Sequence, residues 1–93
     1  MTQVMVKFTG EVWDRMGTGH VDFAFEGTTL GALLDCLLTR YNVRDLLFDE
    51  NGKIRFRSRI TVNGRFSDTL GGMDTPVRDG DTIVLMRPGL GAS

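Results

Sequence analysis

Several residue types are scarce in this sequence, and each scarcity excludes a class of protein. A single cysteine, Cys36, rules out an internal disulfide and fits a reducing compartment, so we expect a cytoplasmic location. The only histidine, His20, has no second ligand at metal-binding spacing. No apolar run approaches membrane-spanning length, and the first residues lack the apolar segment of a signal peptide. The sequence therefore predicts a protein with no metal site and no membrane partner.

The chain also lacks an excess of charge of either sign. The chain has 11 Lys and Arg residues and 12 Asp and Glu residues, a net charge of −1, which argues against general attraction to nucleic acid. We find no nucleophile spaced with a base, no acid–base pair and no phosphate-binding loop motif. With 93 residues there is room for one core. We expect a single domain that binds no cofactor and is not an enzyme on its own.

Alternating apolar residues predict two strands near the start of the chain. Val4, Val6 and Phe8 share one face of the first strand. The second strand is expected over 20–26, with Val21, Phe23 and Phe25 on one face. We expect residues 11–19 to form an irregular connection, so that the two strands make a β-hairpin.

A leucine stripe predicts the main helix. Its members recur at helical spacing and are Leu30, Leu33, Leu34, Leu37, Leu38 and Tyr41. Thr28 or Thr29 can cap the start, and we expect the end near Tyr41, with Asn42 as a left-handed cap. Residues 43–48 are expected to form a further short turn of helix.

The second half of the chain is predicted to be mostly strand and turn. A third strand is expected over 53–63, with Ile54, Phe56, Ile60 and Val62 facing inward and Arg55, Arg57 and Arg59 facing outward. Residues 65–81 are rich in turn signals, with Leu70, Met73 and Val77 as apolar anchors. The last strand is expected over 82–87.

One helix with so wide an apolar stripe must cover one face of a sheet. If the first and last strands pair at the centre, the result is a mixed sheet packed on one main helix. We therefore predict an α+β fold of the β-grasp, or ubiquitin-like, type. The domain is expected to span 1–87, and 88–93 to form a flexible, glycine-rich tail that is presented to a partner.

Two features allow a functional or an incidental interpretation. Cys36 is either a reactive thiol or, as we favour, an incidental residue on the helix surface. Arg55, Arg57 and Arg59 form either a solvated strand face, the default, or a positive strip that docks on an acidic partner surface.

Motifs in the last third of the chain resemble those of the MoaD and ThiS type of ubiquitin-like sulfur carriers. They are the turn Val62-Asn63-Gly64-Arg65, the segment 70–77 (LGGMDTPV), the turn Asp79-Gly80-Asp81, and the strand 83–86 that leads into a glycine-containing tail. The first half matches this family in the order of its elements and in the helix stripe.

The resemblance implies a function carried by the C-terminus. In this family an adenylating enzyme of the ubiquitin-activating type uses ATP to activate a terminal glycine carboxylate, and a persulfide sulfur converts it to a thiocarboxylate. The expected acceptor is the large subunit of molybdopterin synthase, or another acceptor enzyme. Glycine suits such a tail, because any Cβ would obstruct the approach of backbone to nucleotide.

The chain departs from the family pattern at its end. The resemblance places Gly91 at the penultimate glycine and Ala92 at the terminal one, so that Ser93 is extra. Four explanations of this ending are open. In the first, a peptidase removes Ala92 and Ser93 and exposes Gly91 as the sulfur-carrying terminus. In the others, a non-glycine end is tolerated, the two residues are foreign to the protein, or the protein carries no sulfur.

The predicted docking residues are Arg87, Pro88, Gly89, Leu90 and Gly91, together with Arg55, Arg57 and Arg59. The alternative function is a ubiquitin-like binding or regulatory subunit that docks on a partner enzyme. A third is covalent protein modification through the same activated tail.

Overall fold

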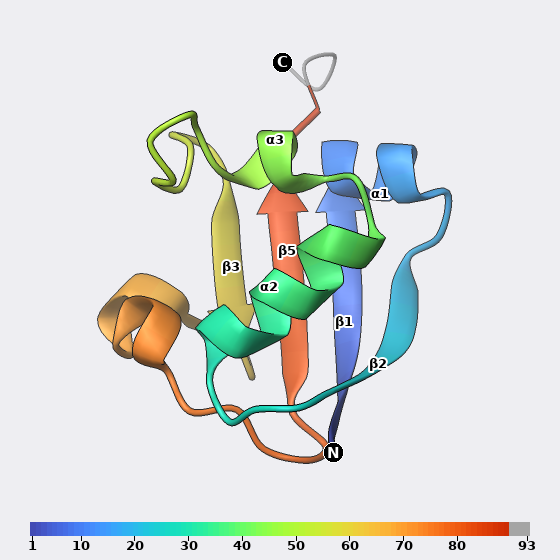
Figure 1. The fold of residues 1–93 in the computed structure, drawn as a ribbon. Coiled ribbons are helices and arrows are strands. Elements are labelled where there is room, and N and C mark those ends of the chain that lie inside the picture. Colours follow the sequence, from blue (N-terminus) through green and yellow to red (C-terminus); the bar gives the residue numbers. More distant parts are fainter. Residues whose placement is uncertain (90–93) are drawn as a thin grey trace.

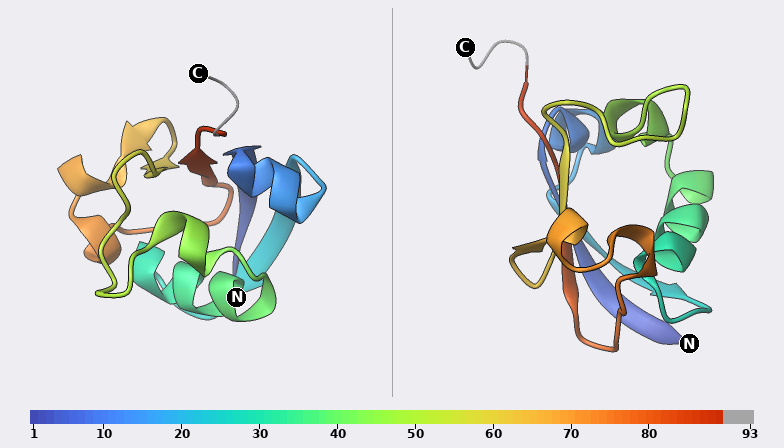
Figure 2. Two further views of the ribbon diagram at one scale, coloured as in Figure 1. Left: turned by 90° about the horizontal axis from the view of Figure 1, so that it is seen from above. Right: turned by 90° about the vertical axis from the view of Figure 1, so that its left-hand side faces the viewer.

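A five-stranded sheet with one long helix across one face makes up the fold (Figures 1 and 2). The structure is a computed structural model that describes residues 1–89. The order of strands across the sheet is β2-β1-β5-β3-β4. The strands are β1 (Thr2–Gly10), β2 (His20–Phe25), β3 (Arg59–Val62), β4 (Arg65–Phe66) and β5 (Thr82–Arg87).

The first and last strands pair at the centre of the sheet, as predicted. β1 and β5 run parallel, while β2 is antiparallel to β1 and β3 is antiparallel to β5. Val4, Val6 and Phe8 alternate inward from β1 and are buried, and Phe23 and Phe25 do the same from β2. The predicted mixed sheet and β-grasp fold are confirmed.

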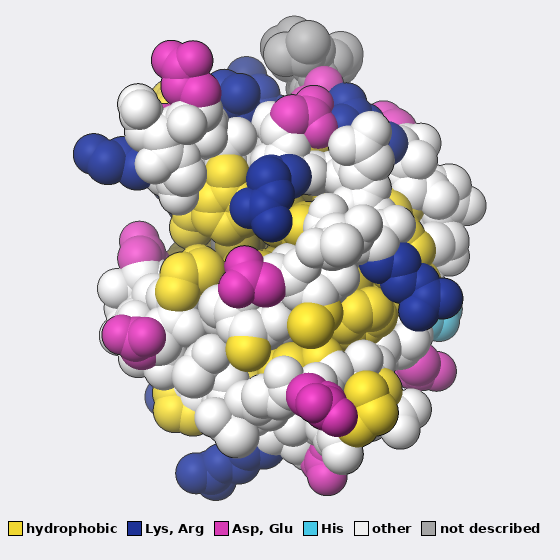
Figure 3. Space-filling model, in the orientation of Figure 1, with side chains coloured by type: hydrophobic (Ala, Val, Ile, Leu, Met, Phe, Trp, Pro, Cys, Tyr) yellow, Lys and Arg dark blue, Asp and Glu magenta, His cyan; other side chains and the backbone are white. Residues whose placement is uncertain are grey.

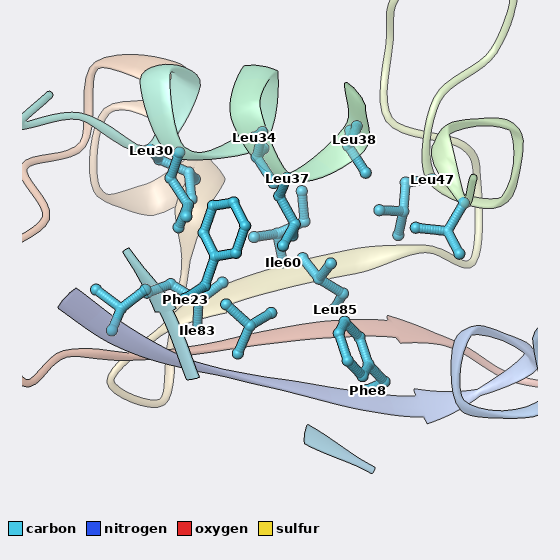
Figure 4. Packing of buried hydrophobic residues seen from close by; sticks show 14 of the residues in the cluster. Phe8, Phe23, Leu30, Leu34, Leu37, Leu38, Leu47, Ile60, Ile83 and Leu85 are labelled. Carbon is cyan, nitrogen blue, oxygen red and sulfur yellow. The ribbon is translucent and has the colours of Figure 1, made fainter. Parts of the chain in front are cut away.

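Helix α2 (Leu30–Arg40) closes the core with its leucine stripe (Figure 4). Thr29 caps its start, since the Thr29 hydroxyl accepts the Ala32 N–H at 3.2 Å. All five of its leucines are buried: Leu30, Leu33, Leu34, Leu37 and Leu38. The left-handed cap predicted at Asn42 is wrong, because the helix ends in extended backbone at Tyr41 and Asn42 has no positive φ.

Three shorter helical segments follow α2 in the chain. α3 (Arg44–Leu47) confirms the short helix predicted after α2 and buries Leu46 and Leu47. The turn-rich segment holds two 3₁₀ turns, η1 (Ser67–Thr69) and η2 (Gly72–Asp74). Val77 is buried and Leu70 packs against the core, as predicted, whereas Met73 is exposed.

The segment predicted as an irregular connection is instead a helix, α1 (Glu11–Met16). Gly17 ends it in the left-handed conformation, with φ of 74°, and donates its N–H to the Trp13 carbonyl at 2.9 Å. Val12 is the one residue of α1 that is buried. Six residues with a single buried position are too few to show a helical period in the sequence.

The predicted third strand is wrong over its first six residues, since β3 begins at Arg59 and not at Lys53. Hydrogen bonds tie the preceding loop to α3: the Asp49 N–H donates to the Lys53 carbonyl, and the Arg55 N–H to the Leu47 carbonyl, both at 2.8 Å. Phe56, expected in the core, is 87% exposed. The alternating apolar and polar residues that predicted a strand from residue 53 therefore lie in a loop as far as residue 58.

An ion pair between Arg15 and Asp45 links α1 to α3, and the Arg15 hydrogen bond lowers the pKa of Asp45. A carboxyl group with a lowered folded-state pKa stabilises the fold above its unfolded pKa of about 3.9, and this contribution disappears as pH falls through the folded pKa. Because the pair is exposed, we expect Asp45→Asn to cost less than about 1 kcal/mol at neutral pH. Urea unfolding of both proteins at neutral and strongly acidic pH should show this difference only at neutral pH. A difference that persists in acid would mean that Asp45 acts through packing.

Candidate functional site

The chain leaves the domain at the end of β5. After Arg87, Pro88 is exposed, and the described chain ends at Gly89, pointing away from the sheet (Figure 2, right). Proline lacks the N–H that a strand needs, so Pro88 cannot donate to a continued ladder. A Cβ built at Gly89 meets no atom within 4 Å. The described part of the tail, Pro88 and Gly89, therefore turns away from the sheet at the end of β5.

Gly10 packs directly against the backbone at the base of this tail. It pairs with Arg87 in the parallel β1–β5 ladder and has a φ of 62°. A Cβ added there would lie 1.9 Å from the Arg87 carbonyl oxygen and 3.1 Å from the Pro88 Cα. Only glycine allows both this backbone conformation and this approach.

We call Arg87 and Pro88 the tail base. The Arg87 side chain links it to two further segments. Its Nε donates to Glu11 Oε2 at 2.8 Å, and its Nη1 donates to the Ser58 hydroxyl at 3.2 Å. Ser58 is fully buried and donates its own proton to the Leu46 carbonyl at 2.7 Å. The direction in which Pro88 leaves the sheet is thus fixed by α1, α3 and the start of β3 together.

We expect Gly10→Ala to destabilise the fold and to disturb the tail base. The Gly10 conformation, with φ of 62° and ψ of −133°, is one that side chains rarely adopt and costs a non-glycine residue about 1–3 kcal/mol, and the contact with the Arg87 carbonyl adds to this. Urea unfolding measures the loss, and the amide NMR signals of Arg87 and Gly89 should shift. Gly64→Ala is the matched control, because Gly64 also has positive φ but a Cβ there meets no atom within 4 Å. Equal losses in the two variants would contradict the role of the close approach.

The face of the sheet that α2 does not cover carries apolar side chains on β5 and β4. Val84 and Met86 alternate with the buried Ile83 and Leu85 and are partly exposed. Phe66, opposite Thr61 in the β3–β4 hairpin, is 47% exposed. Isolated apolar residues are normal on a surface, but apolar side chains on neighbouring strands of an uncovered sheet face suit a contact surface.

The three arginines predicted to share one strand face do not do so. Only Arg59 lies in a strand, where it is paired with Met86 of β5. Arg55 lies in the preceding loop and donates its Nε–H to the Asp45 carbonyl at 2.7 Å. Arg57 has a φ of 109°, which no strand residue adopts. The predicted positive strip is therefore replaced by arginines on a loop and at a strand start.

The other candidate residues lie apart from the tail base. Cys36 and His20 are both exposed. Within residues 1–89, no three His, Cys, Asp or Glu side chains cluster closely enough to hold a metal ion. No helix in this part of the chain has the length and apolar character needed to span a membrane. Leu90, Gly91, Ala92 and Ser93, predicted as the working end of the tail, lie outside the described residues.

Sequence reasoning missed the residues that hold the tail base, namely Gly10, Glu11 and Ser58. Glu11 and Arg87 are 76 positions apart in the chain, so no local pattern joins them. Gly10 could be expected only to end the first strand. The one available signal was Ser58, a small residue among larger ones at an inward position of the alternating segment.

A β-grasp domain whose central last strand leads into a free tail has the architecture of a ubiquitin-like carrier. The model of the ThiS family matches residues 6–91. The chain therefore belongs to the ThiS family and is a small, non-catalytic protein of the ubiquitin-like sulfur carrier group.

Solved structures with the same fold cover nearly the whole chain. Haloferax volcanii small archaeal modifier protein 1 has a TM-score of 0.80 at 19% identity, over 95% of this chain and 99% of that one. Mycobacterium tuberculosis CysO has 0.73 at 27% identity, over 91% and 98%. A putative molybdopterin converting factor subunit 1 from Pyrococcus furiosus has 0.70 at 21% identity, over 95% and 99%. A comparison with curated proteins found no match.

Proposed function

We propose that this protein carries sulfur as a thiocarboxylate on Gly91, after removal of Ala92 and Ser93, and that it donates this sulfur in molybdopterin biosynthesis. The observation that carries the proposal is the tail base. Gly10 packs against the Arg87 backbone, and Glu11 and Ser58 bind the Arg87 side chain, so that Arg87 is held at the point where the chain leaves the sheet. The family match, which extends to residue 91, supports Gly91 as the functional terminus.

The geometry suits a substrate that must enter another protein. The six residues from Pro88 to Ser93 reach about 20 Å when extended. Gly10, Glu11 and Ser58 fix the position of Arg87, where the extended segment begins. A partner that docks on the domain therefore receives the carboxyl end at a defined distance from the docking surface. The domain itself needs no catalytic residue, since the partner supplies the ATP site.

The chemistry is a two-stage exchange at the Gly91 carboxyl group. In the activating enzyme, a carboxylate oxygen attacks the α-phosphorus of ATP and releases pyrophosphate, giving an acyl-adenylate. A persulfide sulfur then displaces AMP, and a thiol cleaves the resulting acyl disulfide to leave the thiocarboxylate. In the acceptor enzyme the thiocarboxylate sulfur forms a bond to the pterin precursor, and water then cleaves the acyl–sulfur bond, which leaves the sulfur on the product and returns the carboxylate.

The large subunit of molybdopterin synthase is the proposed acceptor, and the activating partner is an adenylating enzyme of the ubiquitin-activating type. The motifs of residues 62–86 that resemble the MoaD type support this pathway, and the Pyrococcus furiosus structure bears a molybdopterin-related name.

Pyrophosphate release tests the first stage. A chain truncated after Gly91 should release pyrophosphate from ATP when it is mixed with the adenylating enzyme of its own pathway. The full-length chain should do so only after a peptidase has exposed Gly91. If neither chain is activated and the full-length protein still binds an acceptor enzyme, the protein is a ubiquitin-like binding subunit instead.

Covalent modification of proteins is a second use of the same activated tail. The structural likeness to a protein named small archaeal modifier protein 1 favours it as an alternative. Conjugates joining Gly91 to lysine side chains of other proteins would distinguish covalent modification from sulfur transfer. A protein that only donates sulfur forms no such conjugates.

A further inference from the structure

A groove of about 310 Å³ lies beside the tail base, between the loop that precedes β3 and the segment that follows β4. Residues 54–56 form one wall, residues 66–68 form the other, and Ser58 to Ile60 form the floor. In Figure 3 this side of the molecule is hollowed, with hydrophobic side chains on both lips. Ser58 lines the groove and also accepts the Arg87 hydrogen bond, so the groove adjoins the base of the tail.

The two aromatic residues of the groove are exposed. Phe56 is 87% exposed on one wall and Phe66 is 47% exposed on the other. An exposed phenylalanine leaves a large apolar area in water, and burying such a ring on a partner is a main source of binding energy. Because both rings line the same groove, one apolar side chain of a partner bound there can bury part of each.

The loop that presents Phe56 is held in a strained conformation. The Ser58 N–H donates to the Arg55 carbonyl at 3.0 Å, closing a turn with Phe56 and Arg57 at its centre. Arg57 has a φ of 109°, and such strain persists only where the surroundings fix it. Here the Arg55 backbone N–H and Nε both bond to carbonyls of α3 and its neighbourhood. Phe56 is thus preorganised, which lowers the entropy lost on binding.

Positive charge surrounds this apolar gap. Arg55 and Arg59 line the groove and Arg57 lies on the same loop, while Asp68 is the one acidic residue of its lining. Asp45 and Asp49 offset part of the Arg55 charge, since that charge helps to lower the pKa of both carboxyl groups, so the excess rests mainly on Arg57 and Arg59. Among residues 1–89, the ion pairs involve Arg15 and Arg87, and none of the groove arginines takes part. In a chain of net charge −1, this local excess favours an acidic ligand.

We propose that this groove binds an acidic peptide segment of a partner protein, with one large apolar side chain between Phe56 and Phe66 and carboxylates on Arg55 and Arg59. The proposal deepens the carrier function and rests on it, because a partner held here has its own surface next to the departing tail. Binding of the segment itself requires no tail chemistry, so the two can fail separately.

The probe is a short peptide, blocked at both ends, with a central leucine between glutamates. NMR titration of the full-length chain should shift the amides of residues 54–60 and 66–68. Phe56→Ala and Arg59→Glu should each weaken binding about tenfold, whereas Trp13→Ala should leave it unchanged. Trp13 is the matched control, since it is a 54% exposed aromatic residue outside the groove. A peptide with lysines in place of the glutamates should bind at least about tenfold more weakly.

Several outcomes would overturn the proposal. They are equal binding of the glutamate and lysine peptides, absence of binding at millimolar peptide, or shifts confined to other surfaces. Shifts in the groove amides on removal of residues 90–93 would show that the chain's own tail fills the groove. Concentration-dependent shifts without peptide would show that a second copy fills it. Peptide binding by a chain that cannot be adenylated would leave the groove in place and remove the carrier function alone.

Discussion

The Gly91→Trp substitution, in a chain that ends at residue 91, should slow activation by the adenylating enzyme at least about a hundredfold. The reacting carboxylate must thread a narrow channel beside the nucleotide, and an indole at that position displaces it from the α-phosphorus. ATP-dependent pyrophosphate release measures the rate.

The fold should not change in this variant, because residue 91 follows β5, the last strand of the sheet, and belongs to no element of the core. Urea unfolding should give the same free energy for the Gly91→Trp chain and for its parent. Thr39→Trp is the matched control, since Thr39 is exposed on α2, away from the tail, and should keep full activation. Equal activation of the Gly91→Trp chain and its parent would show that Gly91 does not enter the active site of the adenylating enzyme.

The second large effect is expected in the core. Leu37 is fully buried under α2, where its side chain points at the sheet (Figure 4). Leu37→Ala removes these contacts and leaves a cavity, so we expect a loss of about 2–5 kcal/mol in the free energy of unfolding. This is a large share of the stability of a small domain.

Cys36→Ala provides the comparison for Leu37→Ala on the same helix. Cys36 is the preceding residue but is exposed, so its replacement should change the free energy of unfolding by less than about 0.5 kcal/mol. Urea unfolding measures both variants. A loss below about 1 kcal/mol for Leu37→Ala would mean that α2 does not close the core.

The helix and the central strands could be predicted because their sequence patterns reflect burial directly. The five leucines of α2 recur at helical spacing since each one faces the sheet, and Val4, Val6 and Phe8 alternate since one face of β1 is covered. The order of these elements then left few ways to pair the strands, and the β-grasp arrangement was among them.

The loop before β3 was mispredicted because its alternation has another cause. Phe56 and the arginines around it alternate as in a strand, but Arg57 has positive φ, and hydrogen bonds to α3 direct the backbone away from the sheet. Neither the positive φ of one residue nor a hydrogen bond to a carbonyl of another element changes the spacing of apolar residues in the sequence.

The tail base was only half predictable for a related reason. Pro88 indicates the end of the last strand by its residue type alone, since proline lacks the N–H that a strand needs. Gly10, Glu11 and Ser58 matter because of what they meet in space, which is the carbonyl and the guanidinium of Arg87. Such roles depend on the parallel pairing of β1 with β5, which joins opposite ends of the chain.

Intact mass spectrometry of the protein purified from its native cells tests the carrier function most directly, because one spectrum reports both the terminus and the sulfur. We expect a species that ends at Gly91, and a fraction of it heavier by the exchange of one oxygen for one sulfur. A thiol-alkylating reagent should add one more alkyl group to the heavier fraction than to the rest, because the thiocarboxylate sulfur reacts in addition to Cys36. A protein that keeps Ala92 and Ser93 throughout and carries no additional sulfur would contradict the account.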